Sequence, residues 1–317
     1  MKPLGPIPPG FTAIDGELAI AGRKVSALVE EAGDTPLFVY SAALIRARVA
    51  QLRSALPRRV ALHYAVKANP YRPVLELMAG LVDGFDIASG GELAMVRAAG
   101  IDPARVSFAG PGKRDAELEA AIAAGVTLNL ESESEADRAL GIAERLGVKP
   151  RLAIRVNPDF DLKGSGMKMG GGAKPFGIDA ERVPALARRI IAAGADWRGF
   201  HIFAGSQALD AAAIADTQAQ TLDLAARLAE QTGAALPHCN LGGGLGIPYF
   251  PGDVPVDLAA VGAMLGERLE QLPAVLEETA FCIELGRYLV GESGVYLCRI
   301  VDRKLSHGEL SLTPKKP

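Results

Sequence analysis

The chain has little cysteine, little histidine and few aromatic side chains: three cysteines, four histidines and 5% aromatic residues among 317. Cys239, Cys282 and Cys298 are widely spaced, with no CxxC pair and no histidine at ligand spacing. This spacing excludes a disulfide-rich secreted scaffold and predicts no metal site. We expect three reduced thiols, buried on strands, in a cytoplasmic protein.

The sequence also lacks a long apolar run and an excess of one charge sign. No stretch approaches the roughly 20 apolar residues of a membrane-spanning helix. Pro and Gly interrupt residues 1–10, which excludes a signal-peptide core. The net charge of -3 and the scattered basic residues indicate neither a nucleic-acid partner nor a membrane partner. With 49% hydrophobic residues, the chain is long and apolar enough to bury a large core.

Short apolar runs typical of strands alternate with longer Ala/Leu-rich helical stretches. The predicted strands are 37–41, 60–66, 84–88, 106–109, 127–131, 151–156, 199–204, 238–241 and 281–285. The predicted helices include 92–99, 116–124, 133–146, 183–193, 210–231 and 257–271. Several helices stop at a glycine: Gly100, Gly125, Gly147, Gly194 and Gly233. Eight or nine such units favour an α/β fold with a closed (β/α)8 TIM barrel over an open doubly wound sheet.

The two ends of the chain differ from this pattern. Residues 1–36 are rich in Pro and Gly, and residues 288–301 are typical of antiparallel strands with no helix between them. We therefore expect a barrel over residues 37–287. Residues 1–36 and 288–317 would contribute to a second, all-β domain built from both termini.

Barrel enzymes place their chemistry at the carboxyl ends of the strands, and a lysine follows one of the predicted strands. Lys67 comes after the 60–66 strand among Ala65, Val66 and Ala68, an apolar setting that favours imine formation by the amine. The alternative is a lysine that merely extends into solvent at a strand end. Taken alone, Lys67 leaves both interpretations open.

Two later segments suit a phosphate and a heterocyclic ring. The Gly-Gly-Gly run at 242–244 offers backbone amides to an anion, or it is a plain tight turn. Glu284 can keep a pyridine nitrogen protonated, and Arg287 can bind a phosphate, although a local ion pair between them is the alternative. His201 by itself is typical of a packed core histidine. Asp86 and Glu92 suit a helix start as well as a site.

Four motifs, in this order along the chain, resemble the fold-type III decarboxylases that depend on pyridoxal 5'-phosphate (PLP). This is the diaminopimelate and ornithine decarboxylase family with its alanine-racemase-like barrel. The motifs are Tyr-Ala-Val-Lys-Ala-Asn-Pro at 64–70, Asp-Ile-Ala-Ser-Gly-Gly-Glu-Leu at 86–93, Leu-Gly-Gly-Gly-Leu-Gly-Ile-Pro-Tyr at 241–249 and Glu-Leu-Gly-Arg-Tyr at 284–288. In the last motif Leu285 replaces the family's proline.

The resemblance implies PLP as the cofactor and a role for each matched residue. Lys67 would hold PLP as a Schiff base, and Glu284 would pair with the pyridinium nitrogen. The phosphate would be held by Ser206, Gly243, Gly244 and Arg287, with Gly286 in the same motif. The lysine and the ring surroundings would be ordered by Asp86, Glu92 and Arg155. The resemblance also makes the Lys67 strand the first of eight barrel strands and the Glu284 strand the last, with 37–41 as a lead-in.

The implied activity is decarboxylation of an amino acid, free or carrier-bound, by a homodimeric carboxy-lyase similar to diaminopimelate decarboxylase. Glu284 favours decarboxylation over racemisation. The alanine racemases resemble the decarboxylase family in fold, but they place an arginine at the ring nitrogen. A PLP-dependent amino-acid racemase and a non-catalytic PLP-binding protein are the alternatives.

Three features depart from the family pattern. Phe203 stands where relatives carry a ring-stacking histidine, so it would act as an apolar plate and suggests a divergent branch. That branch would be similar to exosortase-associated decarboxylases or to those acting on carrier-bound amino acids. The glycine-rich segment 163–177, with Pro175 at the family's lysine position, is expected to be a mobile loop near the cleft. Relatives continue through most of the second β-domain, so we expect a C-terminally truncated chain.

Overall fold

The computed structural model describes residues 6–315, with the backbone alone for Met167 and Lys168. Residues 1–5 and 316–317 lie outside the described residues. They belong to the two ranges, 1–36 and 288–317, that are expected to contribute to the second domain. Among the residues described, no helix is both long and apolar enough to cross a membrane.

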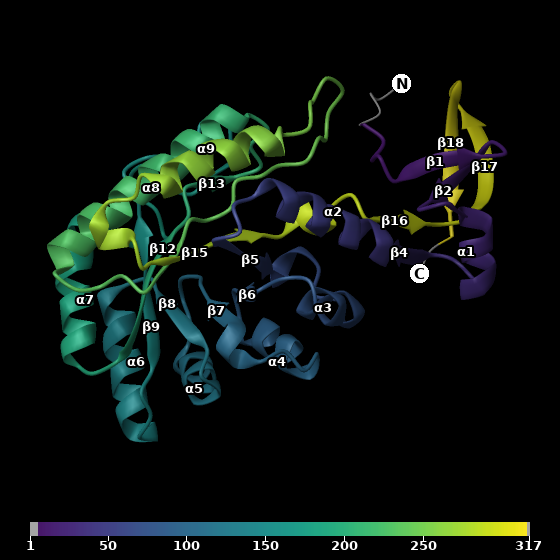
Figure 1. The fold of residues 1–317 in the computed structure, drawn as a ribbon. Coiled ribbons are helices and arrows are strands. Elements are labelled where there is room, and N and C mark those ends of the chain that lie inside the picture. The colour runs from purple at the N-terminus through teal and green to yellow at the C-terminus, as the bar shows by residue number, and fades with distance from the viewer. Residues whose placement is uncertain (1–5, 316–317) are drawn as a thin grey trace.

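Eight parallel strands form a closed barrel (Figure 1). They are β5 (Val60–Ala65), β6 (Gly84–Ile87), β7 (Val106–Phe108), β8 (Thr127–Leu130), β9 (Arg151–Asn157), β12 (Asp196–Ile202), β14 (His238–Asn240) and β15 (Ala280–Leu285). Pairing of β15 with β5 closes the cylinder, and the short strand β11 (Ile178–Asp179) adds to β9. The predicted TIM barrel is confirmed, including its first and last strands.

Helices cover the outside of the barrel and bury their apolar faces against the strands. They are α2 (Ala42–Ala55), α3 (Arg72–Ala79), α4 (Gly90–Ala98), α5 (Asp115–Ala124), α6 (Glu133–Leu146), α7 (Val183–Ala192), α8 (Ala211–Thr232) and α9 (Leu258–Glu270). Short 3-10 turns lie at η1 (Val66–Ala68), η2 (Pro103–Arg105), η3 (Ala180–Arg182) and η4 (Ala274–Leu276). Gly125, Gly147 and Gly233 end their helices in the left-handed conformation, as the sequence predicts.

Strands from both terminal segments form small antiparallel sheets beside the barrel (Figure 1). These strands are β1 (Phe11–Ile14), β2 (Glu17–Ile20), β3 (Arg23–Lys24), β4 (Leu37–Tyr40), β16 (Gly294–Leu297), β17 (Ile300–Ser306) and β18 (Glu309–Pro314). The predicted lead-in strand, β4, pairs with β16 outside the barrel. Helix α1 (Val25–Ala32) also lies in this part, so it is not made of strands alone.

The prediction of strand is wrong for one stretch of the chain. Residues 287–290 form the short helix α10 (Arg287–Val290), which the expectation of antiparallel strands over 288–301 did not include. Tyr288, Leu289 and Val290 are all buried, because one helical turn packs this apolar run into the core. A short apolar run fits a strand and a buried helical turn equally well, so periodicity alone does not separate them.

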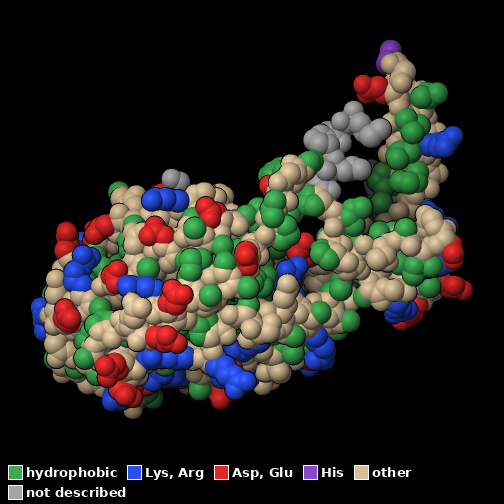
Figure 2. Space-filling view, turned by 45° about the horizontal axis from the view of Figure 1, so that its top comes forward, with side chains coloured by type: hydrophobic (Ala, Val, Ile, Leu, Met, Phe, Trp, Pro, Cys, Tyr) green, Lys and Arg blue, Asp and Glu red, His purple; other side chains and the backbone are tan. Residues whose placement is uncertain are grey.

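The hairpin of β17 and β18 stands away from the rest of the molecule. Every residue of both strands is exposed, and Leu305 and Leu310 are among its bare apolar side chains. Figure 2 shows apolar side chains on this projection, whereas Lys, Arg, Asp and Glu side chains are scattered over the body of the barrel. Cys239 and Cys282 lie buried on strands as expected, whereas Cys298 is half-buried between β16 and β17.

Candidate functional site

A cavity of about 540 Å3 lies at the carboxyl ends of the barrel strands. Its volume falls in the usual range of small-molecule sites. Nine of the predicted site residues line it: Lys67, Asp86, Arg155, Phe203, Ser206, Gly244, Glu284, Gly286 and Arg287. His201, which alone is typical of a core histidine, lines it too. Segments far apart in the sequence therefore meet at the edge of the barrel where chemistry is expected.

Lys67 lies in the 3-10 turn η1, directly after β5. Its side chain is exposed, so the apolar neighbours do not enclose the amine as the sequence suggested. The turn carries Lys67 past the end of the strand, which explains the difference. Just beyond it, the hydroxyl of buried Tyr64 donates to the carbonyl of Asn69 at 3.0 Å. Burial raises the pKa of Tyr64, so this phenol remains a donor that fixes the turn.

Glu284 forms the buried floor of the cavity. Its Oε2 accepts a hydrogen bond from Asn240 Nδ2 at 3.0 Å and lies 3.0 Å from His201 Nε2. Burial opposes ionisation, but His201, Lys67 and Arg155 together lower the pKa of Glu284 to about 2. The carboxylate is therefore negative at neutral pH. Arg287 is not among its partners, so the local ion pair considered from the sequence does not form.

His201 is 1% exposed, and its contact with Glu284 lacks the geometry of a hydrogen bond. Neither ring nitrogen has a hydrogen-bond partner among the residues described. A buried polar group without a partner calls for an explanation, and a bound molecule is one. His201 therefore belongs to the cavity rather than to the apolar core.

A second carboxylate, Glu131, positions Arg155. Arg155 Nη1 donates to Glu131 Oε1 at 3.0 Å, and its guanidinium lies 4.8 Å from the centre of the Phe176 ring. Glu131 also accepts from the amides of Gly110 at 2.5 Å and Gly177 at 2.7 Å. One buried carboxylate thus ties a strand end, a turn and the end of the glycine-rich segment to the cavity wall.

The glycine run forms a tight loop after β14. A Cβ at Gly243 would lie 2.3 Å from the carbonyl oxygen of Glu284, so only glycine fits there. The loop is held by Ala208, whose amide donates to Gly244 O at 2.9 Å and whose carbonyl accepts from Gly246 N at 2.8 Å. In the part of the chain that is described, the amides of Gly243 and Gly244 donate to no protein acceptor. These free donors suit an anion.

Arg287 adds a positive charge beside this loop. Its side chain is exposed, lies 5.6 Å from the Tyr249 ring centre and has no carboxylate partner within residues 6–315. Ser206, on β13 (Gly205–Ser206), lines the same cavity. Strand β13 pairs with β10 (Met167–Lys168), which brings the glycine-rich segment beside the site.

Asp86 and Glu92 have different surroundings. Buried Asp86 has Oδ2 3.2 Å from His63 Nδ1, while its Oδ1 has no partner among the described side chains and backbone. Glu92 does not line the cavity: its Oε2 accepts from Ala88 N at 2.6 Å, and its amide donates to Ser89 Oγ at 3.2 Å. Glu92 therefore caps α4, which is the helix-start arrangement considered as its alternative.

Three residues of the site were missed by reasoning from the sequence. Asn240 contacts Glu284, Glu131 contacts Arg155, and Phe176 lies against the Arg155 guanidinium. Glu131 ends the predicted strand 127–131, and Asn240 lies on the predicted strand 238–241. A search for polar residues at every strand end would have included both.

The closed parallel barrel, with a cavity that holds charged side chains at the carboxyl ends of the strands, has the architecture of the alanine-racemase-like class. Within this class the chain belongs to the fold-type III PLP-dependent decarboxylases. The model of the family described as pyridoxal-dependent decarboxylase, pyridoxal binding domain, matches residues 42–291.

Two relatives are similar in sequence to this chain over most of its length. The L-glutamyl-[BtrI acyl-carrier protein] decarboxylase of Niallia circulans is 32% identical over 87% of this chain and 65% of its own length. The diaminopimelate decarboxylase of Aquifex aeolicus is 36% identical over 90% of this chain and 67% of its own. The chain thus spans about two thirds of the length of the curated relatives it matches.

A solved structure agrees with the fold. Diaminopimelate decarboxylase from Helicobacter pylori, complexed with L-lysine, superposes with a TM-score of 0.81 at 27% identity, covering 92% of this chain and 73% of that one.

The groups around the cavity fit PLP, the cofactor of the family. A buried anion, Glu284, suits a protonated pyridine nitrogen, and His201 lies beside it with Nε2 3.0 Å from the carboxylate and Nδ1 without a hydrogen-bond partner among the residues described. Free loop amides and an unpaired guanidinium suit a phosphate. An exposed lysine amine lies on the same cavity wall.

Proposed function

We propose that this chain carries the PLP-binding barrel of an amino-acid decarboxylase, with Lys67 as the residue that forms the Schiff base. The observation that supports this most is Glu284, a buried carboxylate held by His201 and Asn240 at the floor of the cavity. When bound there, PLP supplies an electron sink for the electron pair left on Cα as carbon dioxide departs. An anion at the ring nitrogen strengthens that sink, because it keeps the nitrogen protonated.

The remaining residues bind and orient. The amides of Gly243 and Gly244, the Ser206 hydroxyl and Arg287 hold the phosphate, with Gly286 leaving room next to Ala68 and Ala65. Phe203 lies half-buried at the cavity wall, where an aromatic plate can cover one face of the ring. Arg155, fixed by Glu131, and Asp86 set the electrostatics near the lysine. The 37–287 range is our proposal for the barrel domain.

The proposed substrate is a diamino acid similar to diaminopimelate, with a carrier-bound amino acid as the second candidate. The names of the relatives support both classes. A second cavity of about 460 Å3 shares Lys67, Ala68 and Arg287 with the first and continues outward past Tyr40 and Tyr296. An elongated substrate would have room there to extend from the reacting carbon. Phe203 in place of a histidine favours a divergent branch for either substrate.

We further propose that the protein works in the cytoplasm as a homodimer, by analogy with the family. Light scattering of the purified chain measures the assembly. If the chain is a monomer at all accessible concentrations, the homodimer proposal is wrong, whereas the proposal that the chain binds PLP is unaffected.

The test of Lys67 uses the absorbance of the chain with PLP, before and after borohydride reduction. Wild type and Lys149→Ala should both show a reducible Schiff-base band and become covalently labelled, because exposed Lys149 precedes β9 at the opposite end of the barrel. Lys67→Ala should lose both signals. A reducible band of wild-type size in Lys67→Ala contradicts the assignment.

The reaction is tested by carbon dioxide release from diaminopimelate, ornithine, lysine, arginine and a glutamyl-loaded carrier protein. Release from any one of them that depends on both PLP and Lys67 supports decarboxylation and names the substrate class. Exchange of the Cα proton for solvent deuterium without carbon dioxide release contradicts it.

A further inference from the structure

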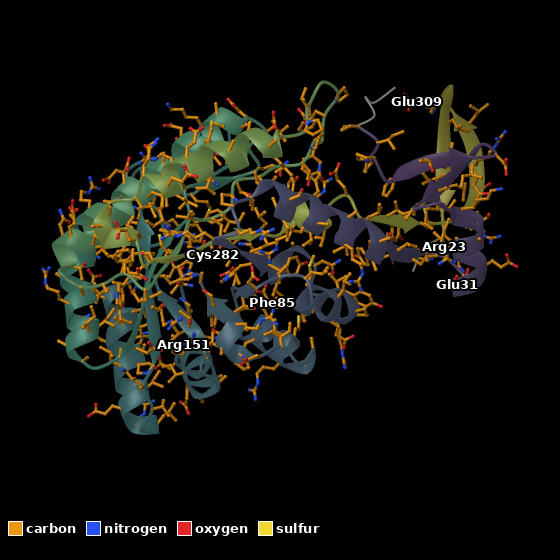
Figure 3. All side chains as sticks on the ribbon, viewed as in Figure 1. Arg23, Glu31, Phe85, Arg151, Cys282 and Glu309 are labelled. Atoms are coloured by element: carbon orange, nitrogen blue, oxygen red, sulfur yellow. The ribbon has the colours of Figure 1, made fainter. Side chains whose placement is uncertain are left out.

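Three potential metal ligands meet inside the barrel, beneath the cavity described above. They are His63 on β5, His238 on β14 and Cys282 on β15, and one ligand atom from each lies within 4.8 Å of the others. Figure 3 labels Cys282 within the barrel. No other group of this kind occurs among the residues described.

The strand register explains why these side chains meet. Strands β14, β15 and β5 are consecutive in the barrel, with His238 opposite Ala280 and Glu284 opposite His63. Side chains two apart on a strand share a face, so Cys282 points into the barrel like Glu284 but one layer lower. The three residues lie 175 and 44 positions apart in the sequence, which is why a search for ligand spacing predicts no metal site.

A carboxylate orients one of the imidazoles. Asp86 Oδ2 lies 3.2 Å from His63 Nδ1, which leaves Nε2 of that ring for a metal ion, and His63 also interacts with the Cys282 thiol. Metal-binding histidines almost always hold their second nitrogen in such a contact, because it fixes the tautomer and the ring orientation. Gly84 makes room for the ring, since a Cβ there would lie 2.4 Å from His63 Nε2.

The cluster is reachable from solvent. A cavity of about 290 Å3 at the amino ends of the strands is lined by both His63 and His238, together with Asn240, Arg151 at the start of β9 and Arg198 on β12. Cys282 is 0% exposed and lies behind the two imidazoles. A metal ion entering from this side would meet two nitrogens and one sulfur, with a fourth position facing the cavity.

We propose that His63, His238 and Cys282 form a binding site for a single borderline metal ion of the zinc class. Imidazole nitrogen and thiolate sulfur are the ligands that zinc prefers, and three protein ligands with an open fourth position are typical of its accessible sites. Tetrahedral zinc places ligand atoms roughly 3.5 Å apart, so binding requires an inward shift of about 1 Å. The thiol proton of Cys282 leaves to solvent as the sulfur–metal bond forms.

This site is separate from the proposed decarboxylase chemistry and does not depend on it. Zinc and PLP would bind at opposite ends of the same barrel interior. Two groups are common to both. Asp86 contacts His63 and lines the upper cavity, and Asn240 lines the lower cavity and donates to Glu284.

The experiment titrates Co2+ and Zn2+ separately into the 317-residue chain with PLP bound. Tetrahedral Co2+ absorbs in the red part of the visible spectrum, away from the cofactor, so its spectrum reports coordination directly. We expect one equivalent of Co2+ with these bands, displacement by one equivalent of Zn2+, and a melting temperature that rises with zinc concentration.

Cys282→Ser and His238→Gln should each abolish the tetrahedral spectrum and the zinc-dependent shift in melting temperature. The matched controls Cys298→Ser and His307→Gln, which alter a half-buried thiol and an exposed imidazole elsewhere, should retain both. Circular dichroism establishes that each variant is folded before it is titrated. Absence of stoichiometric binding in wild type, or equal binding by the folded Cys282→Ser and His238→Gln variants, overturns the proposal.

Discussion

At the scale of single residues, the carboxylate of Glu284 decides what the cavity can do. It is buried and negative, and two side chains from neighbouring strands contact the same oxygen. Replacing the Glu284 carboxylate by the amide of glutamine preserves the shape of the side chain and removes its charge. This substitution therefore distinguishes an electrostatic role from a packing role.

We predict that Glu284→Gln lowers kcat for decarboxylation by about 100-fold or more while leaving PLP bound, because a preorganised charge in a buried site contributes on that order. The measurements are carbon dioxide release and the absorbance of bound cofactor. Glu278→Gln, an exposed change that precedes the same strand, should retain wild-type activity. An unchanged kcat in Glu284→Gln would show that this carboxylate does not act on the cofactor.

Phe203 permits a second test at this scale. If its ring covers one face of the cofactor, Phe203→Ala should weaken PLP affinity about fivefold, which corresponds to a stacking contribution of roughly 1 kcal/mol. Equilibrium dialysis with PLP measures the change. Phe250→Ala, which removes an exposed phenylalanine that does not line the cavity, should have no effect. Equal affinities for Phe203→Ala and wild type would remove Phe203 from the cofactor contacts.

At the scale of elements, one carboxylate joins the starts of two neighbouring helices. Glu117 on α5 accepts hydrogen bonds from the amides of Gly90 at 2.8 Å and Arg114 at 3.0 Å. Gly90 is the first residue of α4 and belongs to the second motif of the sequence. The Arg114 and Gly90 amides, with the Arg114 side chain, lower the pKa of Glu117 to about 2.

The lowered pKa of Glu117 makes the free energy of unfolding depend on pH. A lowered pKa contributes stability that is present above the ordinary value of 4.5 and is lost as the pH falls toward about 2. We predict that Glu117→Gln lowers the free energy of unfolding by roughly 1–2 kcal/mol at neutral pH. The difference from wild type should shrink steadily below pH 4.5. Urea unfolding across this range measures it, and a difference independent of pH would contradict the assignment.

The elements show what the sequence could and could not predict. The barrel strands were found because strands buried on both faces are continuously apolar, and helix 133–146 was found because an Ala/Leu-rich stretch ends at a glycine. Helix α1 and the turn α10 were missed, since short helices carry too few residues for a clear period. The exposure of the Lys67 side chain was missed because Lys67 lies in the turn after the strand and not on the strand itself.

The site was predictable to the extent that its residues stand at strand ends. Lys67, Glu284 and Arg287 could be selected because each carries its own chemistry. Asn240 and Glu131 also stand at or near strand ends, but nothing in the sequence singles them out, because their importance comes from partners 44 and 24 positions away. Those pairings arise only when parallel strands lie side by side, so they depend on the register of the closed barrel.

At the scale of the whole molecule, the barrel and the terminal hairpin differ in how they are held. The barrel has one continuous apolar core. The hairpin of β17 and β18 has no buried residue and is joined to the rest by a few polar contacts. One of these is the bond from Arg299 N to Thr35 Oγ1 at 3.1 Å.

We predict that limited proteolysis removes the hairpin well before the barrel is cut, because segments with few buried contacts open locally at low free-energy cost. Mass spectrometry should find a resistant fragment that ends near residue 300. This fragment should keep the melting temperature and the PLP spectrum of the intact chain. Loss of barrel and hairpin at the same protease concentration would show that they unfold as one unit.

The way Glu284 is held has a consequence for altering this protein by design. Its contacts come from β12 and β14, which flank one another in the barrel beside β15, whereas Phe176 and Tyr249 reach the two cavities from long connecting segments. The electronic centre and the outer walls are thus encoded by separable parts of the chain. Exchange of residues 163–175 with those of relatives would alter the outer walls, while the strands, with Phe176 and Gly177 on Arg155 and Glu131, preserve the environment at the floor.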